Sequence, residues 1–206
     1  MSAIDIFQSG FRLPEKVCIL APGPNGLGCY GAIPQSHTVV AISKAVLIDE
    51  VSRKSVWVMC HGDQGWFDRA NSQFHGVRLF SKDALREAGA KLDGLSPTYY
   101  FQAPPEMLEP HNVHLVGGAI RYGTTVSGCA LQFAYNFGAR EILLCGVDMS
   151  GDDYWDGTRN TSGYHGEVWP AARTINALIR WLGAERGIKV ASLSRTRLEV
   201  DMACSQ

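Results

Sequence analysis

Hydrophobic residues in this chain gather into short runs that polar, glycine-containing segments separate. The runs are rich in valine, isoleucine and other residues that favour β-structure, and turn-forming residues bound them. Several are apolar at consecutive rather than alternate positions, which is typical of strands that helices cover on both faces. The predicted strands are residues 17–21, 38–42, 55–60, 77–80, 99–102, 113–116, 142–147 and 190–193.

The spacing of apolar residues predicts helices between the later strands. One covers 127–137 and ends at Gly138, because glycine commonly occupies the left-handed position after a helix. A longer one covers about 168–187 and has Pro170 in its first turn. Weaker helical patterns cover 44–52 and 82–90. Alternating strands and helices predict an α/β fold: a doubly wound, mostly parallel, Rossmann-like sheet in three layers, with residues 1–206 as one domain.

Composition and charge exclude several classes of protein. With 46% hydrophobic and 19% charged residues, the chain is an ordinary globular protein. Its net charge of -1 gives no field that would attract nucleic acid. The apolar runs are far shorter than the ~20 residues of a transmembrane helix. The first residues lack a basic and an apolar signal region, so we expect a cytoplasmic protein.

The six cysteines form no CxxC pair, and several lie inside apolar runs. This distribution predicts buried thiols rather than a disulfide framework or a zinc site. His111 and His114 have no partner ligand motif, so we expect no metal site there.

The first segment with candidate chemistry follows the strand predicted at 17–21. Gly23, Pro24 and Asn25 belong to a glycine- and proline-rich turn whose backbone could approach a phosphate or ribose. The turn lacks the GxGxxG fingerprint, and its two prolines remove N–H donors, so a plain connecting turn remains an alternative. Ser43, directly after the strand at 38–42, belongs to the same predicted nucleotide-binding set.

A second segment is rich in hydroxyl groups and leads into the helix at 127–137. Thr125, Ser127 and Gly128 lie where the first N–H groups of that helix are free to bind a phosphate. The alternative is that Thr125 or Ser127 only caps the helix, which needs no ligand.

A third candidate is Asp148, at the end of the strand predicted at 142–147. In a doubly wound sheet, ligands bind beyond the carboxyl ends of the strands. A carboxylate there can accept hydroxyl groups of a sugar, hold a metal or orient a neighbouring donor. Its alternative role is to cap the next loop.

The long loop at 151–167 contains Tyr154, Arg159, Tyr164 and His165. Histidine is suited to proton transfer near neutral pH, whereas tyrosine hydroxyls and arginine can bind a departing phosphate.

The connector at 62–76 is also long, and a loop of this length inside a domain is commonly functional. His61, with Asp63 and Trp66, forms a weaker cluster there that could contact an acceptor.

In chain order these motifs resemble those of the bacterial CMP-sialic-acid-dependent sialyltransferases and of the related Rossmann-like hydroxymethylpterin diphosphokinase-like proteins. The matching pieces are Gly23-Pro24-Asn25, Val126-Ser127-Gly128, Gly146-Val147-Asp148, and then Tyr154 and His165.

The sialyltransferase resemblance implies that His165 is the general base and that Tyr154 stabilises the leaving phosphate. We therefore expect a nucleotide-sugar-dependent glycosyltransferase with a small-molecule nucleotide donor, a hydroxyl acceptor, no tightly bound cofactor and no metal. One alternative is pyrophosphoryl transfer with Mg²⁺ held by Asp148 and either Asp152 or Asp153. Another is a nucleotide- or glycan-binding protein without turnover. The oligomeric state stays open.

Overall fold

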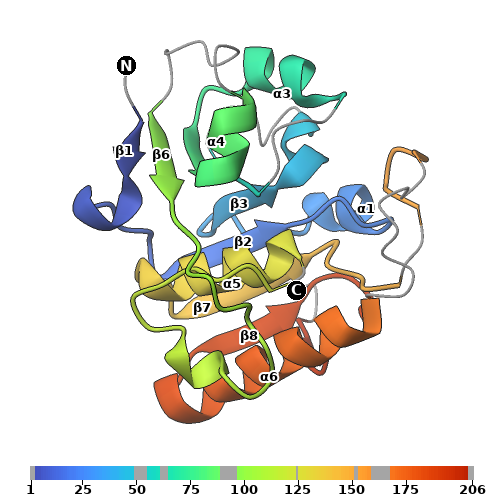
Figure 1. The fold of residues 1–206 in the computed structure, drawn as a ribbon. Coiled ribbons are helices and arrows are strands. Elements are labelled where there is room, and N and C mark those ends of the chain that lie inside the picture. Colours follow the sequence, from blue (N-terminus) through green and yellow to red (C-terminus); the bar gives the residue numbers. More distant parts are fainter. Residues whose placement is uncertain are drawn as a thin grey trace.

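The computed structural model describes residues 3–48, 55–60, 65–88, 97–123, 125–150, 153–158 and 168–203. They form a nine-stranded sheet with the order β1-β6-β5-β4-β3-β2-β7-β8-β9, in which all neighbouring strands are parallel (Figure 1). The prediction of a doubly wound parallel sheet is therefore confirmed. The strands are β1 Ile4–Asp5, β2 Lys16–Leu20, β3 Thr38–Ile42, β4 Val56–Met59, β5 Val77–Ser81, β6 Thr98–Phe101, β7 Glu141–Cys145, β8 Lys189–Ser192 and β9 Asp201–Met202.

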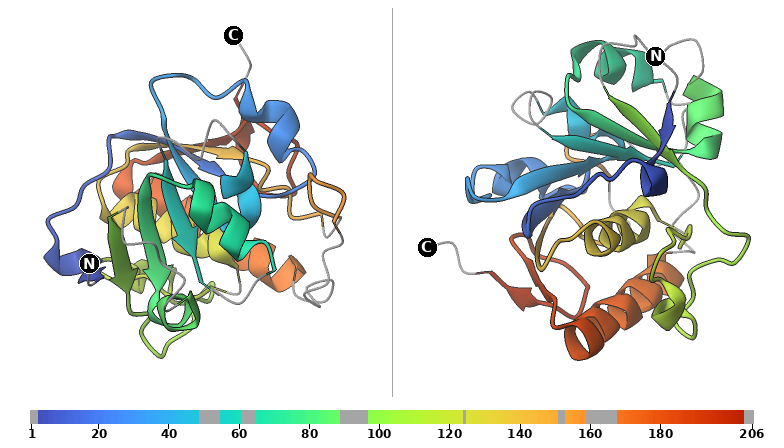
Figure 2. Two further views of the ribbon diagram at one scale, coloured as in Figure 1. Left: turned by 90° about the horizontal axis from the view of Figure 1, so that it is seen from above. Right: turned by 90° about the vertical axis from the view of Figure 1, so that its left-hand side faces the viewer.

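Helices cover both faces of this sheet (Figure 2). On one face lie α5 and α6, and on the other lie α1, α3 and α4. The α-helices are α1 Gly26–Tyr30, α3 Phe67–Gln73, α4 Lys82–Ala88, α5 Val126–Asn136 and α6 Val168–Arg186; short 3-10 helices are η1 Ile6–Gln8, η2 Ser43–Leu47 and η4 Val113–Leu115. No helix of the described ranges is long and apolar enough to cross a lipid bilayer.

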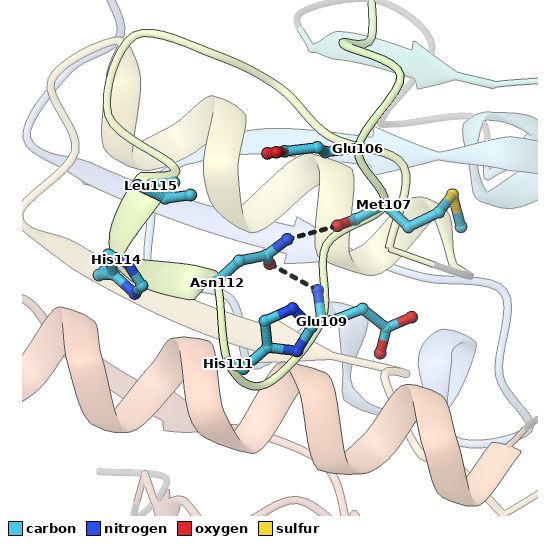
Figure 3. Close-up of a pocket in the computed structure, with 7 residues that line it drawn as sticks. All are labelled: Glu106, Met107, Glu109, His111, Asn112, His114 and Leu115. Atoms are coloured by element: carbon cyan, nitrogen blue, oxygen red, sulfur yellow. Dashed lines mark hydrogen bonds between the residues drawn. The ribbon is translucent and has the colours of Figure 1, made fainter.

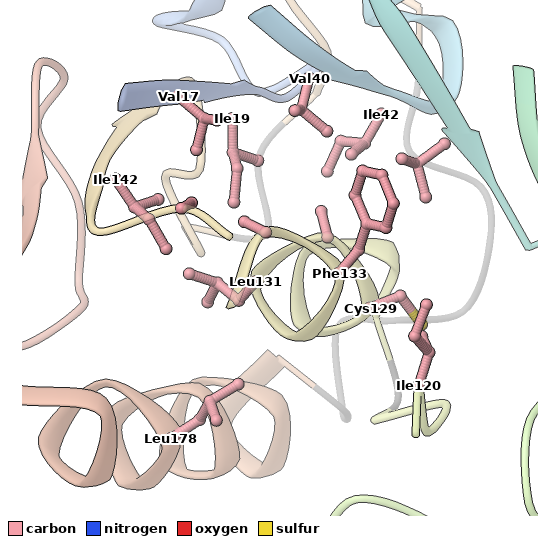
Figure 4. Packing of buried hydrophobic residues seen from close by; sticks show 14 of the residues in the cluster. Val17, Ile19, Val40, Ile42, Ile120, Cys129, Leu131, Phe133, Ile142 and Leu178 are labelled. Atoms are coloured by element: carbon pink, nitrogen blue, oxygen red, sulfur yellow. The ribbon is translucent and has the colours of Figure 1, made fainter. Parts of the chain in front are cut away.

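Two hydrophobic layers result from the alternation of side chains along the central strands. Val17 and Ile19 of β2 point toward α5, whose Leu131 and Phe133 pack against the sheet (Figure 4). Cys18 and Leu20 of β2 belong to the layer on the opposite face. In that layer the buried indole of Trp57 contacts the rings of Phe67, Phe74 and Phe80, with centroids 5.1–5.6 Å apart. Both faces of the sheet are thus buried, as its continuous apolar runs predict.

The prediction of a strand at 113–116 is wrong, because this segment forms η4. Val113 and Val116 are buried, whereas His114 and Leu115 are exposed. A buried side chain at every third position suits a 3-10 helix, with three residues per turn, and not a strand.

The connector at 62–76 is not the irregular loop that its composition suggests. Its described part contains α3, which buries Phe67 and Ala70, and the C-cap residue Phe74 continues this helical spacing. In the region predicted as a helix at 44–52, the described part is η2, and residues 49–52 lie outside the described ranges. A further helix, α1, lies within the glycine-rich turn. The sequence pattern did not predict it, because glycine has a low helix propensity.

The order of the strands reverses at β2. From β2 the chain builds β3, β4 and β5 successively on one side, and it later returns to place β7 on the other side of β2. The loops that follow β2 and β7 therefore leave adjacent strands in different directions. Such a reversal, at the carboxyl ends of the strands, is where open α/β sheets bind their ligands.

Candidate functional site

The loops after β2 and β7 pack against each other so closely that glycine is required on both. The Gly23 N–H donates a hydrogen bond to the Gly146 carbonyl at 3.1 Å. A Cβ atom on Gly23 would lie 2.2 Å from that carbonyl oxygen, and one on Gly26 would lie 2.5 Å from the Ala21 oxygen. Gly146 itself has a φ of 72°, in the left-handed region. Packing of the two loops therefore accounts for Gly23 without any ligand.

Asp148 ties these loops together. Its Oδ2 accepts a hydrogen bond from the Asn25 N–H at 3.0 Å, and its Oδ1 accepts one from the Ser194 hydroxyl at 3.1 Å. The Asp148 carbonyl accepts a third bond, from the Arg197 N–H at 3.1 Å. Asp148 is only 5% exposed, whereas Asn25 is exposed and its side chain does not cap α1. The carboxylate thus holds the turn from which the Asn25 side chain projects.

At the end of β3, Ser43 and Lys44 form the next part of this edge. Ser43 has a φ of 49°, which non-glycine residues seldom adopt. The Lys44 side chain is buried, lies 3.8 Å above the centre of the Tyr154 ring and donates to the Asp156 carboxylate at 2.8 Å. Desolvation raises the pKa of Asp156, but hydrogen bonds from Lys44 and Thr158 outweigh it and lower that pKa from its ordinary value.

The described part of the loop after β7, residues 153–158, also contacts the first turn. The backbone N–H of Trp155 donates to the Pro22 carbonyl at 3.2 Å. Lys44, which follows β3, holds Tyr154 and Asp156 of the same loop. Loops from β2, β3 and β7 therefore meet at one edge. They bring together these predicted site residues: Gly23, Pro24, Asn25, Ser43, Asp148 and Tyr154.

The start of α5 lies one strand farther along the same edge. The Cys129 sulfur, in the first turns of α5, is 3.5 Å from the sulfur of Cys60, which directly follows β4. Thr125 is the N-cap, because its Oγ1 accepts a hydrogen bond from the Gly128 N–H at 3.2 Å. Ser127 is buried. Capping is thus the observed role of Thr125. The N–H groups of the helical residues before Gly128 have no hydrogen-bond partner within α5.

Five predicted residues lie outside the described ranges: His61, Asp63, Arg159, Tyr164 and His165. So does Asp152, one of the two aspartates proposed to hold Mg²⁺ with Asp148, whereas Asp153 is described and exposed. In the described ranges no group of three or more histidine, cysteine or acidic side chains is arranged to hold a metal ion.

Sequence reasoning missed Ser194 and Lys44. The Ser194 Oγ accepts from the Gly146 N–H at 2.9 Å and donates to Asp148, so it links the loop after β8 to that after β7. Its position shortly after a predicted strand was an available signal. Lys44 lies 112 residues from Asp156 in the chain, and local patterns do not report such a pairing.

A separate, open cavity of ≈ 370 Å³ lies in the connection between β6 and α5 (Figure 3). Asn112 organises it by donating to the Met107 carbonyl and accepting from the Glu109 N–H, both at 2.8 Å. The connection also bonds to Asn136, the last residue of α5, which lies at the opposite end of that helix from the strand-end loops. None of the residues that line the cavity belongs to the loops after β2, β3 or β7.

Solved structures of a sialyltransferase share this fold. The sialyltransferase CstII from Campylobacter jejuni, in complex with the substrate analogue CMP-3FNeuAc, aligns with a TM-score of 0.56 and 14% identity, over 93% of this chain and 87% of that one. Two variants of the same enzyme in complex with CMP align with TM-scores of 0.53 and 0.52 at 14% and 15% identity, over 92% of this chain and 87% of theirs. No protein-family model and no curated protein matches the sequence. At this identity, the likeness shows a shared fold.

Proposed function

We propose that this protein is a nucleotide-sugar-dependent glycosyltransferase of the sialyltransferase-like type. The observation that carries the proposal is the meeting of the loops after β2, β3 and β7 at the reversal of strand order, with the Asn25 side chain exposed there. The shared fold supports it, because the structures of similar fold contain CMP or a CMP-sugar analogue.

In this proposal the donor nucleotide lies along the strand-end loops. The Asn25 side chain bonds the nucleoside, while the free N–H groups at the start of α5 face the phosphate. Asp148 acts as a positioning residue, since both of its carboxylate oxygens already bond protein donors. Backbone strain supports a binding role for this edge: Ser43 and Met149 both have positive φ, at 49° and 52°.

The proposed reaction is an in-line displacement at the anomeric carbon of the donor. His165 takes the proton of the acceptor hydroxyl while the oxygen of that hydroxyl bonds to the anomeric carbon. At the same time the bond between the anomeric carbon and the phosphate oxygen breaks. The departing phosphate gains negative charge, which the Tyr154 hydroxyl, Arg159 and helix N–H groups stabilise. Lys44 fixes the position of Tyr154 through the contact of its ammonium with the ring.

The pyrophosphoryl-transfer alternative needs Mg²⁺ at Asp148. The Asn25 N–H and the Ser194 hydroxyl occupy the carboxylate in the geometry described here. This favours glycosyl transfer over metal-dependent chemistry at Asp148.

The experiment is a thermal-shift panel of CMP, CDP, UDP, GDP and ATP, each with and without EDTA. A nucleotide at 100 times its Kd adds about 2.7 kcal/mol to the free energy of unfolding. We expect cytidine nucleotides to raise the melting temperature equally with and without EDTA. CMP release from CMP-sialic acid then tests for turnover. A flat panel would contradict the proposed donor site, whereas a shift by ATP that EDTA abolishes would support the pyrophosphokinase alternative.

A further inference from the structure

Two cysteine sulfurs face each other beside the Asp148 loop. The Sγ atoms of Cys29, in α1, and Cys145, the last residue of β7, lie 2.9 Å apart, although 116 residues separate them in the chain. Cys29 is half-buried and Cys145 is buried, and both occur as free thiols. Cys29 is thus the more exposed cysteine of the pair.

The surroundings make the two thiols chemically unequal. A hydrogen bond from the Cys145 thiol lowers the pKa of Cys29 to about 7, against the opposing effects of burial and of the Asp148 charge. The same hydrogen bond and burial raise the pKa of Cys145. Of the two thiols, Cys29 is therefore the one that ionises more readily, and Cys145 is the one that keeps its proton.

We propose that Cys29 and Cys145 form a redox-modifiable dithiol, which closes to a reversible disulfide by exchange with a small disulfide such as oxidised glutathione. In the first step the Cys29 thiolate attacks one glutathione sulfur, a mixed disulfide forms, and one glutathione thiolate leaves. Cys145 then loses its proton and attacks the Cys29 sulfur, releasing the second glutathione. Two protein thiols are oxidised, and one glutathione disulfide is reduced to two thiols.

Closure requires little movement. The sulfur separation must fall from 2.9 Å to the about 2.05 Å of a disulfide. Cys145 belongs to β7, which is paired on both sides within the sheet, whereas Cys29 lies in the short helix α1. The new bond would link the turn that carries Asn25 covalently to β7.

The chain contains a matched control pair. Cys60 and Cys129 have sulfurs 3.5 Å apart, but both side chains are buried. A hydrogen bond with Cys129 and burial raise the pKa of Cys60. The two thiols are close together, but they are inaccessible to a small disulfide and Cys60 is not favoured as a thiolate. We therefore expect this pair to stay reduced.

The experiment incubates the folded full-length protein, with Cys204→Ser as background, in oxidised glutathione near pH 8 and maps the products by peptide mass spectrometry. We expect a disulfide between the Cys29 and Cys145 peptides, with two thiols lost per chain, and dithiothreitol should restore both. The Cys60→Ser variant should behave identically. In the Cys145→Ser protein the reaction should stop at a glutathione adduct on Cys29.

Three results would overturn the proposal. In the first, the wild-type protein does not react with oxidised glutathione. In the second, the wild-type reaction stops at the glutathione adduct. In the third, a Cys60–Cys129 disulfide forms as fast as the Cys29–Cys145 disulfide. Because the wild-type peptide map decides each of them, the test does not depend on the folding of any variant at Cys29 or Cys145. It is also independent of nucleotide binding.

Discussion

Removal of the Asp148 carboxylate tests whether this residue positions the turn after β2. Asp148→Ala deprives the Asn25 N–H and the Ser194 hydroxyl of their acceptors, which lie at 3.0 and 3.1 Å. Hydrogen bonds to a charged group contribute about 1.5–3 kcal/mol each. The Asn25 N–H is only part-buried and the hydroxyl can rotate, so water recovers part of this loss. We expect a destabilisation of about 2–4 kcal/mol, a value that lies between the loss of one such hydrogen bond and the loss of both.

Urea unfolding of wild-type and variant protein measures this change, with an unchanged m-value as evidence that the unfolded state is comparable. For a chain of this size, 3 kcal/mol corresponds to a fall in melting temperature of about 6–12 °C. Asp148→Asn is the matched control: its carbonyl can still accept from the Asn25 N–H and its amide can donate to Ser194, so we expect a smaller loss, about 1 kcal/mol.

A double-mutant cycle with Ser194→Ala separates the contact from general damage. Ser194 bonds both Asp148 and the Gly146 N–H, so the two substitutions should be non-additive by about 0.5–3 kcal/mol. CMP affinity, measured by calorimetry per folded molecule, should fall in Asp148→Ala because the turn carrying Asn25 loosens. A stability within about 0.5 kcal/mol of wild type would refute the positioning argument, since that is the range of ordinary surface substitutions.

Four other outcomes follow from the site. His165→Ala should lower turnover by about 10²–10⁴ with CMP affinity unchanged, because only the proton acceptor is lost; near-normal turnover would assign the base to another group. Thr125→Ala should cost about 1 kcal/mol in urea unfolding, and Thr125→Ser should restore it, because only the cap to the Gly128 N–H is lost; an equal loss in both variants would contradict the cap. Alkylation of Cys29 by iodoacetamide, followed by mass spectrometry in the Cys204→Ser background, should rise with pH through about 7, as the thiolate forms; a midpoint at the ordinary thiol value would contradict the lowered pKa. The pKa of Asp156 is lower in the folded protein than its ordinary value of 3.8, so the Asp156 carboxylate stabilises the fold above pH 3.8, and this stabilisation is lost as pH falls through the folded pKa. Asp156→Asn should therefore destabilise the protein at pH 7 but not in strong acid. An equal effect at both pH values would contradict the ion pair with Lys44.

The amino-acid pattern alone determined the architecture of this protein. Runs such as 142–147 are apolar at successive positions, and such runs are stable only as strands covered on both faces, hence in a parallel sheet with helices on either side. The helix at 168–186 was visible because its burial repeats at the helical period. The helix at 126–136 is buried at consecutive positions, and the glycine at 138 marked its end. Local periodicity reports which side of an element is buried, and it placed the candidate loops after the correct strands.

Periodicity failed where burial is sparse or where glycine masks it. The segment 113–116 buries only its first and last residues, a pattern too short to separate a strand from a 3-10 turn. The short helix α1 begins in a glycine-rich turn that reads as irregular.

The contacts that build the candidate site were decided only by the tertiary structure. These contacts all join residues at least 46 positions apart in the chain. They are the hydrogen bonds of Asp148 with Asn25 and Ser194, the ion pair of Lys44 with Asp156, and the contact between the sulfurs of Cys29 and Cys145. They exist because β7 inserts beside β2 and brings loops from separate parts of the chain to one edge. A local pattern reports whether a side chain is buried, and the order of the strands determines which side chains it is buried against.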